Sequence, residues 1–282
     1  MDHNRFVATR KILRRFFRNA TAVFGAATIS LVLIIATVGP FLYNVSSTSP
    51  SYSPLLPPFS TRPLGTDDLG RDIMAQMMAG ARVSMIVAFF AAISTVFIGL
   101  TVGAVSGYKG GAIDSLLMRI TDIFLMIPTF ILMIVVLTIF APSTIEKIIL
   151  VMGLLAWPVT ARLTRAQFLT LKQQQFVDAQ RVMGVKERTI IFRQILPNAA
   201  SPLIVQFSYE MATAILTEAG LSFLGLGDPN NLSWGYMLYE SIPFLRSAWW
   251  MSLFPGIAIF LMVLSLNLLG DGVNESLSPY VR

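Results

Sequence analysis

The chain has 282 residues, of which 55% are hydrophobic and only 13% are charged, and its formal net charge is +6. A soluble domain typically carries about one quarter charged residues, so this composition excludes an ordinary water-soluble enzyme and a disordered protein. The sequence has no cysteine, which excludes a disulfide scaffold and thiolate metal sites. The one histidine, His3, lies in the N-terminal tail, which argues against zinc hydrolases and Ser-His-Asp catalysis.

Six runs of mainly apolar residues have about the length that a helix needs to cross a bilayer, roughly 20 residues. They cover residues 20–42, 83–107, 120–141, 148–163, 199–216 and 249–270. The first run is too long for the apolar core of a secretory signal peptide, and no clear cleavage site follows it, so we expect a retained anchor. The sequence thus predicts an all-α, polytopic membrane protein with six transmembrane helices.

The basic residues are distributed unevenly between the two sides that six spans define. Sixteen of the 21 Lys and Arg residues fall on the side that holds both termini and the link 164–197 with its edge. The other side holds Arg62, Arg71, Arg82, Lys147 and Arg246. By the positive-inside rule the basic side is the cytoplasm, so we predict cytoplasmic tails 1–19 and 272–282 and outer segments 43–82 and 217–248. The basic excess is a topology signal, and nucleic acid is not an expected partner.

The outer segment 43–82 divides into two parts. Residues 49–63 are rich in Pro and Ser and predict an extended crossing. A helix over 67–82 is predicted by four apolar residues at helical spacing, namely Leu69, Ile73, Met77 and Met78. Beyond the second outer segment, Trp249 and Trp250 are expected at the outer membrane interface, where indole rings favour the headgroup region.

The cytoplasmic link 164–197 is long for a connection between spans, which suggests that it has a function of its own. Residues 176–183 predict a short amphipathic helix, and Gly184 suits the left-handed position that ends a helix. A second helix is expected to run through Ile190 and to stop at Pro197. Two interpretations stay open: a compact knob on the membrane face, or an amphipathic hairpin that lies on anionic lipid.

Motifs for catalysis are missing from the sequence. The glycine-rich stretch 107–111 lacks the Lys and Ser/Thr spacing of a phosphate-binding loop. The carboxylates are scattered without a paired acid and base, and we predict no metal site. If ATP drives this protein, another chain binds it. We therefore expect a membrane component that is not an enzyme and that binds no cofactor itself.

The segment DAQRVMGVKERTIIFRQILP, residues 178–197, resembles the EAA loop of ABC-importer permeases, EAA-x3-G-x9-I-x-LP. The positions in register are Ala179, Gly184, Leu196 and Pro197, whereas Asp178, Gln180 and Gln194 replace the Glu, Ala and Ile of the motif. Four further segments are similar to the C-type subunit of the dipeptide/oligopeptide permease family: RPLGTDDLGRDIMAQMMAGARVSM (62–85), IDSLLMRITDIFLMIPTF (113–130), LTEAGLSFLGLGDPNNLSWGYML (216–238) and WWMSLFPGIAIFLMVLSLNLLGDG (249–272).

This resemblance implies a type I ABC importer permease fold with a core over 83–271, in the inner membrane of a prokaryote. Such a subunit pairs with a second, B-type permease, with two ATPase subunits that hold ATP and Mg, and with an extracytoplasmic solute-binding protein, and it works by alternating access. The implied substrates are dipeptides or oligopeptides, with an oligosaccharide or a metal chelate as the alternative in the same class. A stand-alone secondary transporter is the weaker alternative, because Glu210 is the one clear intramembrane acid.

The resemblance assigns the coupling to the partner ATPases to the helix 176–183 and the turn that follows it. The residues expected at that contact are Phe176, Asp178, Ala179, Arg181, Val182, Met183, Gly184, Lys186 and Arg188. They combine apolar side chains with surrounding charge, which is the usual anatomy of a protein interface.

Two further sets of residues are candidates for the transport route. Gln206, Glu210 and Thr213 recur on one helical face of the fifth predicted span, together with Thr217. Because a charge that faces lipid is costly, we expect this face to turn inward, where it either lines the pathway or contacts the partner permease. An apolar, glycine-rich stretch follows the span and contains Leu221, Phe223, Gly225 and Gly227. It is expected to form either simple helix-end packing or an outer gate.

Overall fold

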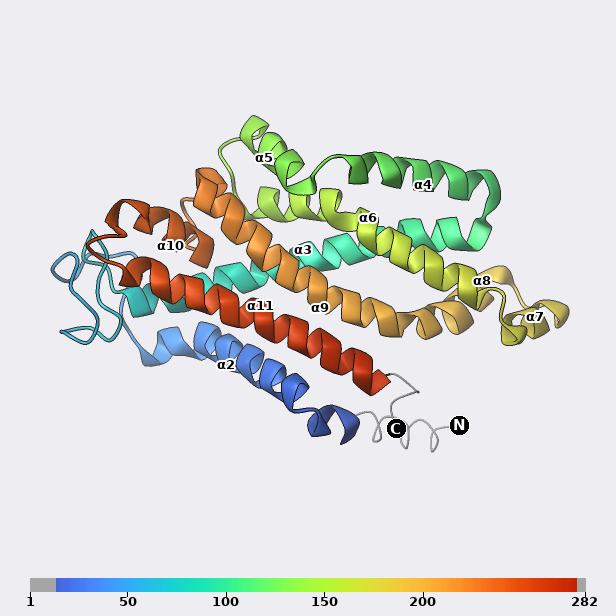
Figure 1. Ribbon diagram of the computed structural model, residues 1–282, viewed down its shortest axis with the longest axis horizontal. Helices are drawn as coiled ribbons and strands as arrows, with labels where there is room; N and C mark the ends of the chain where they lie inside the picture. The colour runs from blue at the N-terminus through green and yellow to red at the C-terminus, as the bar shows by residue number, and fades with distance from the viewer. Residues whose placement is uncertain (1–13, 278–282) are drawn as a thin grey trace.

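The computed structural model describes residues 14–277, so residues 1–13 and 278–282 of the predicted tails lie outside the described part of the chain. Within residues 14–277 the regular elements are helices, and an isolated antiparallel bridge joins Thr66 to Asp72. The predicted all-α class is confirmed. The long helices run along the longest axis of the molecule, so the loops between them gather at its two ends (Figure 1).

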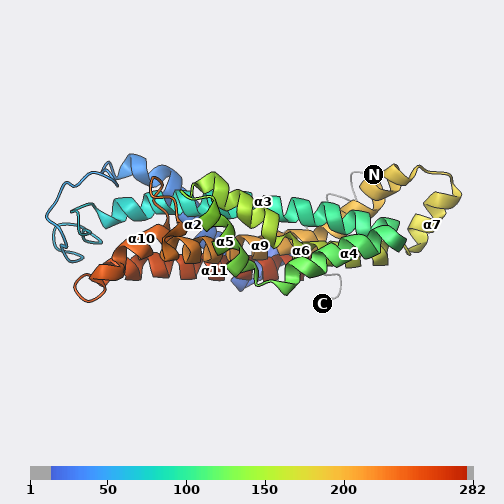
Figure 2. The same cartoon turned by 90° about the horizontal axis from the view of Figure 1, so that it is seen from above.

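The body of the described chain is built from the long helices α2 (Ala20–Leu42), α3 (Ile73–Lys109), α6 (Ile145–Leu171), α9 (Leu196–Leu221) and α11 (Trp250–Leu277). A bent pair, α4 (Gly111–Met126) and α5 (Thr129–Ile139), packs on α6. The short helices α7 (Gln175–Val182) and α8 (Glu187–Ile190) lie at one end, and α10 (Trp234–Ser241) lies at the other (Figures 1 and 2). The π-helical turns η1 (Ile191–Ile195) and η2 (Ser222–Leu226) flank α9, and the 3-10 turn η3 (Ile242–Phe244) follows α10.

Within residues 14–277, four helices are long and apolar enough to cross a membrane, namely α2, α3, α6 and α11. The bent pair of α4 and α5 makes a fifth if it counts as one span. Helix α9 is 26 residues long and is not among these four, and it carries the polar residues Gln206, Glu210 and Glu218. The count of six transmembrane helices therefore stays a prediction.

The predicted span 120–141 is not continuous. Helix α4 ends at Met126, α5 begins at Thr129, and the two are bent by 82° relative to one another. The break falls at Ile127, whose backbone is extended, and at Pro128. A residue that precedes proline is pushed out of the α region by the proline ring, which explains why the helix stops there.

Helix α3 begins at Ile73 and continues unbroken into the membrane-spanning region, so the helix predicted over 67–82 is confirmed from residue 73 onward and is wrong for residues 67–72. The residues before Ile73 form a turn, because the Asp67 carboxylate accepts hydrogen bonds from the backbone N–H groups two and four residues further along. Such local side-chain bonds compete with helical backbone bonds. Asp72 then caps the helix by accepting from the N–H of the third residue after it.

The second helix of the cytoplasmic link does not stop at Pro197, contrary to the prediction. Helix α8 passes through the π turn η1 directly into α9, and Pro197 lies in the first turn of α9. The proline directly follows the π turn, in which the N–H of Leu196 bonds to the carbonyl of Ile191. A helix can thus continue through the site of a proline when a local π turn adjusts the backbone bonds around it. The short helices at this end are therefore joined to α9 without an intervening loop.

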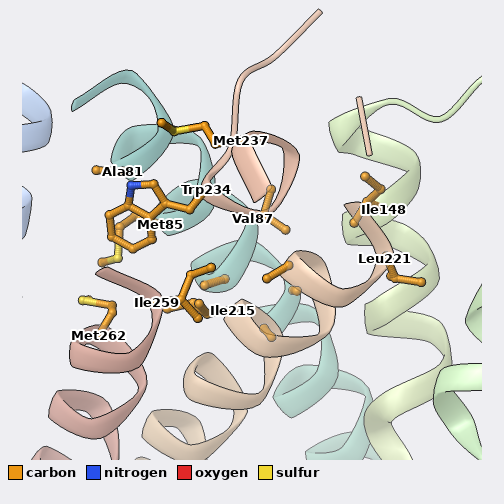
Figure 3. Close-up of a cluster of buried hydrophobic side chains, with 14 of the residues drawn as sticks. Ala81, Met85, Val87, Ile148, Ile215, Leu221, Trp234, Met237, Ile259 and Met262 are labelled. Carbon is orange, nitrogen blue, oxygen red and sulfur yellow. The ribbon is translucent and has the colours of Figure 1, made fainter. Parts of the chain in front are cut away.

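The main hydrophobic core lies between α3, α6, α9, α10 and α11. In Figure 3, Trp234 of α10 lies beside Ala81 and Met85 of α3, above Ile259 and Met262 of α11. The Trp234 indole Nε1 donates a hydrogen bond of 3.1 Å to a backbone carbonyl of α3. Because this buried donor is satisfied, the tryptophan fixes α10 on α3 without the cost of an unpaired polar group.

Helices α3 and α6 approach so closely that side chains are excluded from one stripe of α3. A Cβ on Gly99 would lie 2.6 Å from Cβ of Thr160, and one on Gly103 would collide with the carbonyl oxygen of Ala161. Small residues four positions apart allow this close packing in membrane helices. Helix α9 packs against both α3 and α6.

Candidate functional site

A cavity of about 360 Å³ lies between α3, α5, α6 and α9. The residues predicted for the pathway, Gln206, Glu210 and Thr213, all line it, and so does Thr217. The helical spacing read from the sequence therefore corresponds to a real polar face. Across the cavity the other helices contribute mainly apolar side chains, such as Phe130 of α5.

Glu210 is the only carboxylate among the residues that line this cavity, and no Lys or Arg lines it. Its side chain is buried, and its Oε1 accepts hydrogen bonds from Thr160 Oγ1 at 3.0 Å and from Gln206 Nε2 at 2.9 Å. Both bonds end on the same oxygen, so Oε2 is left to accept from a group that enters the cavity. The site is chemically suited to a cationic or hydrogen-bond-donating guest.

Sequence reasoning missed two polar residues at this site. Thr160 of α6 is fully buried and contacts Glu210 across 50 positions of sequence. Tyr209 lines the cavity, and its hydroxyl donates to Asp271 of α11 at 2.5 Å. A single threonine or tyrosine in an apolar run does not indicate a functional site. Only the packing of α6 and α11 on α9 shows which residue each of these two side chains contacts.

All nine residues predicted for the ATPase contact are exposed at the α7 end of the molecule. They are Phe176, Asp178, Ala179, Arg181, Val182, Met183, Gly184, Lys186 and Arg188. Val182 is 89% exposed and Met183 is 66% exposed, which is unusual for neighbouring apolar side chains at a helix end. Gly184 has φ +70°, as predicted for a left-handed helix stop, and a Cβ placed on it would meet no atom within 4 Å.

Helix α7 rests on a small hydrophobic core of its own. Val177 is fully buried there against Phe168 of α6 and against Ile190 and Ile195, which precede α9. Arg181, predicted to offer charge to a partner, instead pairs with Asp178 at 3.1 Å and lies 3.9 Å from Glu187 of α8. This core and these ion pairs favour the compact knob over a hairpin lying on lipid.

The stretch 221–227 forms the corner between α9 and α10. Leu221 is fully buried, whereas Phe223 is exposed, and Gly225 adopts φ +81° inside η2. A Cβ on Gly227 would lie 2.6 Å from the Ser222 hydroxyl oxygen. These contacts support the packing interpretation of this stretch and leave a gating role as a prediction.

Two buried carboxylates hold the same corner together. Glu218 Oε1 accepts from the hydroxyls of Ser222 and Ser233, which lie on the two sides of the corner, at 2.7 and 2.6 Å. Asp228 accepts from the backbone N–H of Ile145 at 3.2 Å, at the N-terminus of α6. An anion at a helix N-terminus is favoured by the helix dipole, so the corner is tied to both α9 and α6.

At the opposite end from α7, charged groups are paired within the chain. Arg71 contacts Asp67 at 2.5 Å and Glu240 of α10 at 3.1 Å, and Asp67 is almost fully buried. Burial raises the pKa of Glu240, and the neighbouring Arg71 opposes that rise. Trp250 is buried and donates from Nε1 to the backbone carbonyl of Thr66, whereas Trp249 is exposed. The loop 43–72 is therefore fastened to α10 and α11. The expected position of both tryptophans at the outer membrane interface stays a prediction.

Comparison with known proteins identifies the family. The model of the binding-protein-dependent transport system inner membrane component matches residues 99–282, and the model of the N-terminal TM domain of oligopeptide transport permease C matches residues 8–58. The chain belongs to the family of binding-protein-dependent transport system inner membrane components. The predicted resemblance to ABC-importer permeases is thereby confirmed.

Individual relatives cover nearly the whole chain. A dipeptide transport system permease protein, DppC, from Alkalihalophilus pseudofirmus is 38% identical over 97% of this chain and 90% of its own length. The oligopeptide transport system permease protein OppC of Bacillus subtilis is 37% identical over 95% of this chain and 88% of its own length. The glutathione transport system permease protein GsiD of Pectobacterium atrosepticum is 37% identical over 97% of this chain and 91% of its own length.

The MetNI methionine ABC transporter in inward-facing conformations supplies a structural relative. One of its chains superposes with a TM-score of 0.56 at 17% identity and covers 71% of this chain and 94% of its own length. At that identity the likeness concerns the fold alone, and it agrees with the predicted permease fold.

Proposed function

We propose that this chain is a permease subunit of an ATP-driven importer that moves dipeptides or oligopeptides across the cytoplasmic membrane of a prokaryote. The names of the relatives support the peptide class of substrate. The observation that carries the proposal is the α7 knob, which has a core of its own and exposes Val182 and Met183. Exposed apolar side chains on a rigid element, surrounded by charge, are the anatomy of a protein interface.

The partners follow from this assignment. One of two ATPase subunits would receive α7 in a cleft, and both ATPases would bind ATP and Mg, because this chain has no phosphate loop. A second, B-type permease would complete the pathway, and an extracytoplasmic solute-binding protein would dock at the opposite end, against the loop 43–72 and α10. The basic asymmetry of the sequence supports a cytoplasmic position for both termini and for α7.

The coupling would run from α7 to the cavity through the packing of α7 on its neighbours and then along the unbroken helical run of α8, η1 and α9. Val177 seats α7 on α6 and on the segment before α9, and α8 and η1 lead directly into α9. Closure of the ATPases would move α7 as a rigid body, and α9 carries Glu210 and the rest of the polar face. Such a lever converts ATP-driven closure into alternating access.

The cavity would form this chain's part of the translocation route. Glu210 Oε2 would accept a hydrogen bond from a cationic part of the substrate, for example a peptide α-amino group, while Thr160 and Gln206 hold Oε1. The stretch with Gly225 and Gly227 would close the route on the outer side. Selection among substrates would belong largely to the solute-binding protein.

The test is reconstitution of the complex from its separate chains. The permease pair should recruit two ATPases, and loaded binding protein should raise ATP hydrolysis together with peptide uptake. Ligands retained by the co-purified binding protein should be peptides, whereas an oligosaccharide or a metal chelate there would contradict the peptide assignment. Uptake by this chain without ATPases would instead support a secondary transporter.

A further inference from the structure

The corner between α9 and α10 contains a buried acid that the proposed mechanism does not use. Glu218, in the last turn of α9, is only 3% exposed. Its Oε1 accepts hydrogen bonds from the hydroxyls of Ser222, which begins η2, and of Ser233, which caps α10. Its Oε2 is also buried and makes no hydrogen bond within residues 14–277. This carboxyl group therefore joins both sides of the corner through one oxygen.

The other buried acids in the described part of the chain differ from Glu218 in how their charge is compensated. Asp67 and Asp72 each lie beside an arginine. Asp228 accepts from backbone N–H groups, one of them at the N-terminus of α6, and Glu210 lines a cavity. Glu218 has two neutral hydroxyl donors and, within residues 14–277, neither a cation nor a backbone N–H as a partner. A buried carboxylate in such surroundings is costly unless it takes up a proton.

The charged groups around the corner do not compensate Glu218 within the described residues. The titratable side chains at this end of the surrounding elements are Arg82 of α3, Glu146 and Lys147 of α6, Glu210 of α9, Asp228 before α10, and Tyr236, Tyr239 and Glu240 of α10. Arg82 is exposed, and the Lys147 ammonium donates to two backbone carbonyls of the loop between α5 and α6. The remaining groups are acids or phenols, whose charge does not stabilise an anion. Burial raises the pKa of Glu218, and hydrogen bonds from the Ser233 and Ser222 hydroxyls oppose that rise.

We propose that Glu218 is a proton-binding site that latches this corner: the acid is neutral while α9 and α10 are joined, and it ionises when the corner opens to water. In the closed corner the Oε2–H bond is intact, and the carbonyl oxygen Oε1 accepts from both serines. On opening, the Oε2–H bond breaks and the proton passes to water. Because an ionised carboxylate returns to an apolar site only at a cost, a higher pH favours the open corner.

The proton site itself is independent of the substrate and of the partner chains. Its use in transport rests on the proposed function, in which the stretch with Gly225 and Gly227 closes the route. The experiments below therefore measure the proton site and the opening of the corner directly, so that their failure is distinguishable from a failure to transport peptides.

The first experiment follows the stability of the full chain in detergent as the pH changes. A group whose pKa is raised by folding contributes stability that is fully present below its unfolded pKa, about 4.3 for Glu, and that is lost as the pH rises through the folded-state pKa. Glu218→Gln is neutral at every pH and keeps one acceptor oxygen for the two serines. Relative to the unmodified protein, the Tm of this variant should therefore rise by about 4 °C or more between pH 5 and pH 8.

The matched control is Glu146→Gln, because Glu146 is an exposed acid near the same end. Its Tm relative to the unmodified protein should not change with pH. If the Tm difference between Glu218→Gln and the unmodified protein is constant or changes in the opposite direction, the proposal is overturned. Should Glu218→Gln fail to fold, infrared spectra of the Glu210→Gln variant at pH 7 decide: the carbonyl band of a protonated carboxylic acid supports the proposal, and its absence overturns it.

The second experiment locates the opening by hydrogen–deuterium exchange in the assembled transporter. At pH 8 the amides of residues 222–236 should exchange about tenfold faster in the unmodified protein than in Glu218→Gln, whereas at pH 5 the two should exchange equally. Comparison of the two proteins at the same pH removes the chemical dependence of exchange on pH. Equal exchange of this segment at both pH values would overturn the latch.

Discussion

At the end that carries the loop 43–72 and α10, charged side chains are buried and paired within the chain, whereas at the α7 end apolar side chains are exposed and have only a small core beneath them. Asp67, Arg71 and Glu240 form a closed ionic cluster, but Val182 and Met183 face away from the protein. At the first end the ionic cluster is satisfied within the chain. The α7 end has the composition of a surface that a partner protein covers.

The largest expected effect is a loss of stability when the ionic cluster is broken. Asp67→Ala should destabilise the protein by about 3–5 kcal/mol, because it leaves a partly buried Arg71 and the Gln76 amide without the carboxylate that they share. Denaturant unfolding of the purified chain in detergent measures this loss. Asp68→Ala is the matched control, since Asp68 is half-buried and makes no ion pair within residues 14–277. Equal stability of the two variants would show that the cluster contributes nothing.

The next effect concerns the α7 end, where function should change and stability should not. Phe176→Ala combined with Met183→Ala should weaken recruitment of the ATPases by at least about tenfold, because apolar anchors dominate interface energies. Unfolding should shift little, since both side chains are exposed. Pull-down of ATPases and binding-protein-stimulated hydrolysis measure recruitment. Full recruitment by this variant would favour the lipid-surface interpretation of α7.

Two substitutions at Gly184 distinguish the effect of backbone strain from the effect of a disturbed contact with a partner at the α7 end. Gly184→Arg should uncouple hydrolysis from transport, because φ +70° strains any side chain and the new side chain points into open space that a partner would occupy. Gly184→Asn is the control, since asparagine tolerates the left-handed region. If both variants transport normally, Gly184 is not at the interface.

Glu210 provides a smaller and more selective effect in the interior, between the two ends. Glu210→Gln keeps the hydrogen-bonding shape but removes the charge, so uptake of cationic peptides should fall by about tenfold while neutral peptides change less than about twofold. Competition between the two peptides in one vesicle preparation measures the ratio. An unchanged ratio with normal assembly would leave Glu210 as a polar contact between helices.

The smallest effect is expected at the corner between α9 and α10. Gly225→Val should raise basal ATPase activity about two- to threefold if this stretch is a gate, because a side chain at φ +81° costs about 1–2 kcal/mol and would shift the corner. Hydrolysis is measured without binding protein. Activity equal to that of the unmodified complex would leave only the packing role of this corner.

The sequence was informative wherever local chemistry decides the outcome. Gly184 stops α7 because it enters the left-handed region easily. The break at Pro128 was missed when one span was predicted over 120–141, although the proline ring excludes the preceding residue from the helix. The same local reasoning failed at Pro197, where the helix continues through the π turn η1 into α9. It also failed at Asp67, whose side-chain hydrogen bonds replaced an expected helix with a turn.

What the sequence alone determined was the apolar helical character of the chain, its basic asymmetry, the polar face of α9 and the short helix that ends at Gly184, because each depends on composition, periodicity or a single local residue. Only the tertiary structure decided that Thr160 holds Glu210, that Arg71 joins Asp67 to Glu240, and that Trp250 is buried under the loop 43–72. Each of these contacts joins residues that are distant in sequence or involves a side chain that is common in apolar runs. These contacts can be recognised only in the folded chain, where helix packing brings the partners within hydrogen-bonding distance.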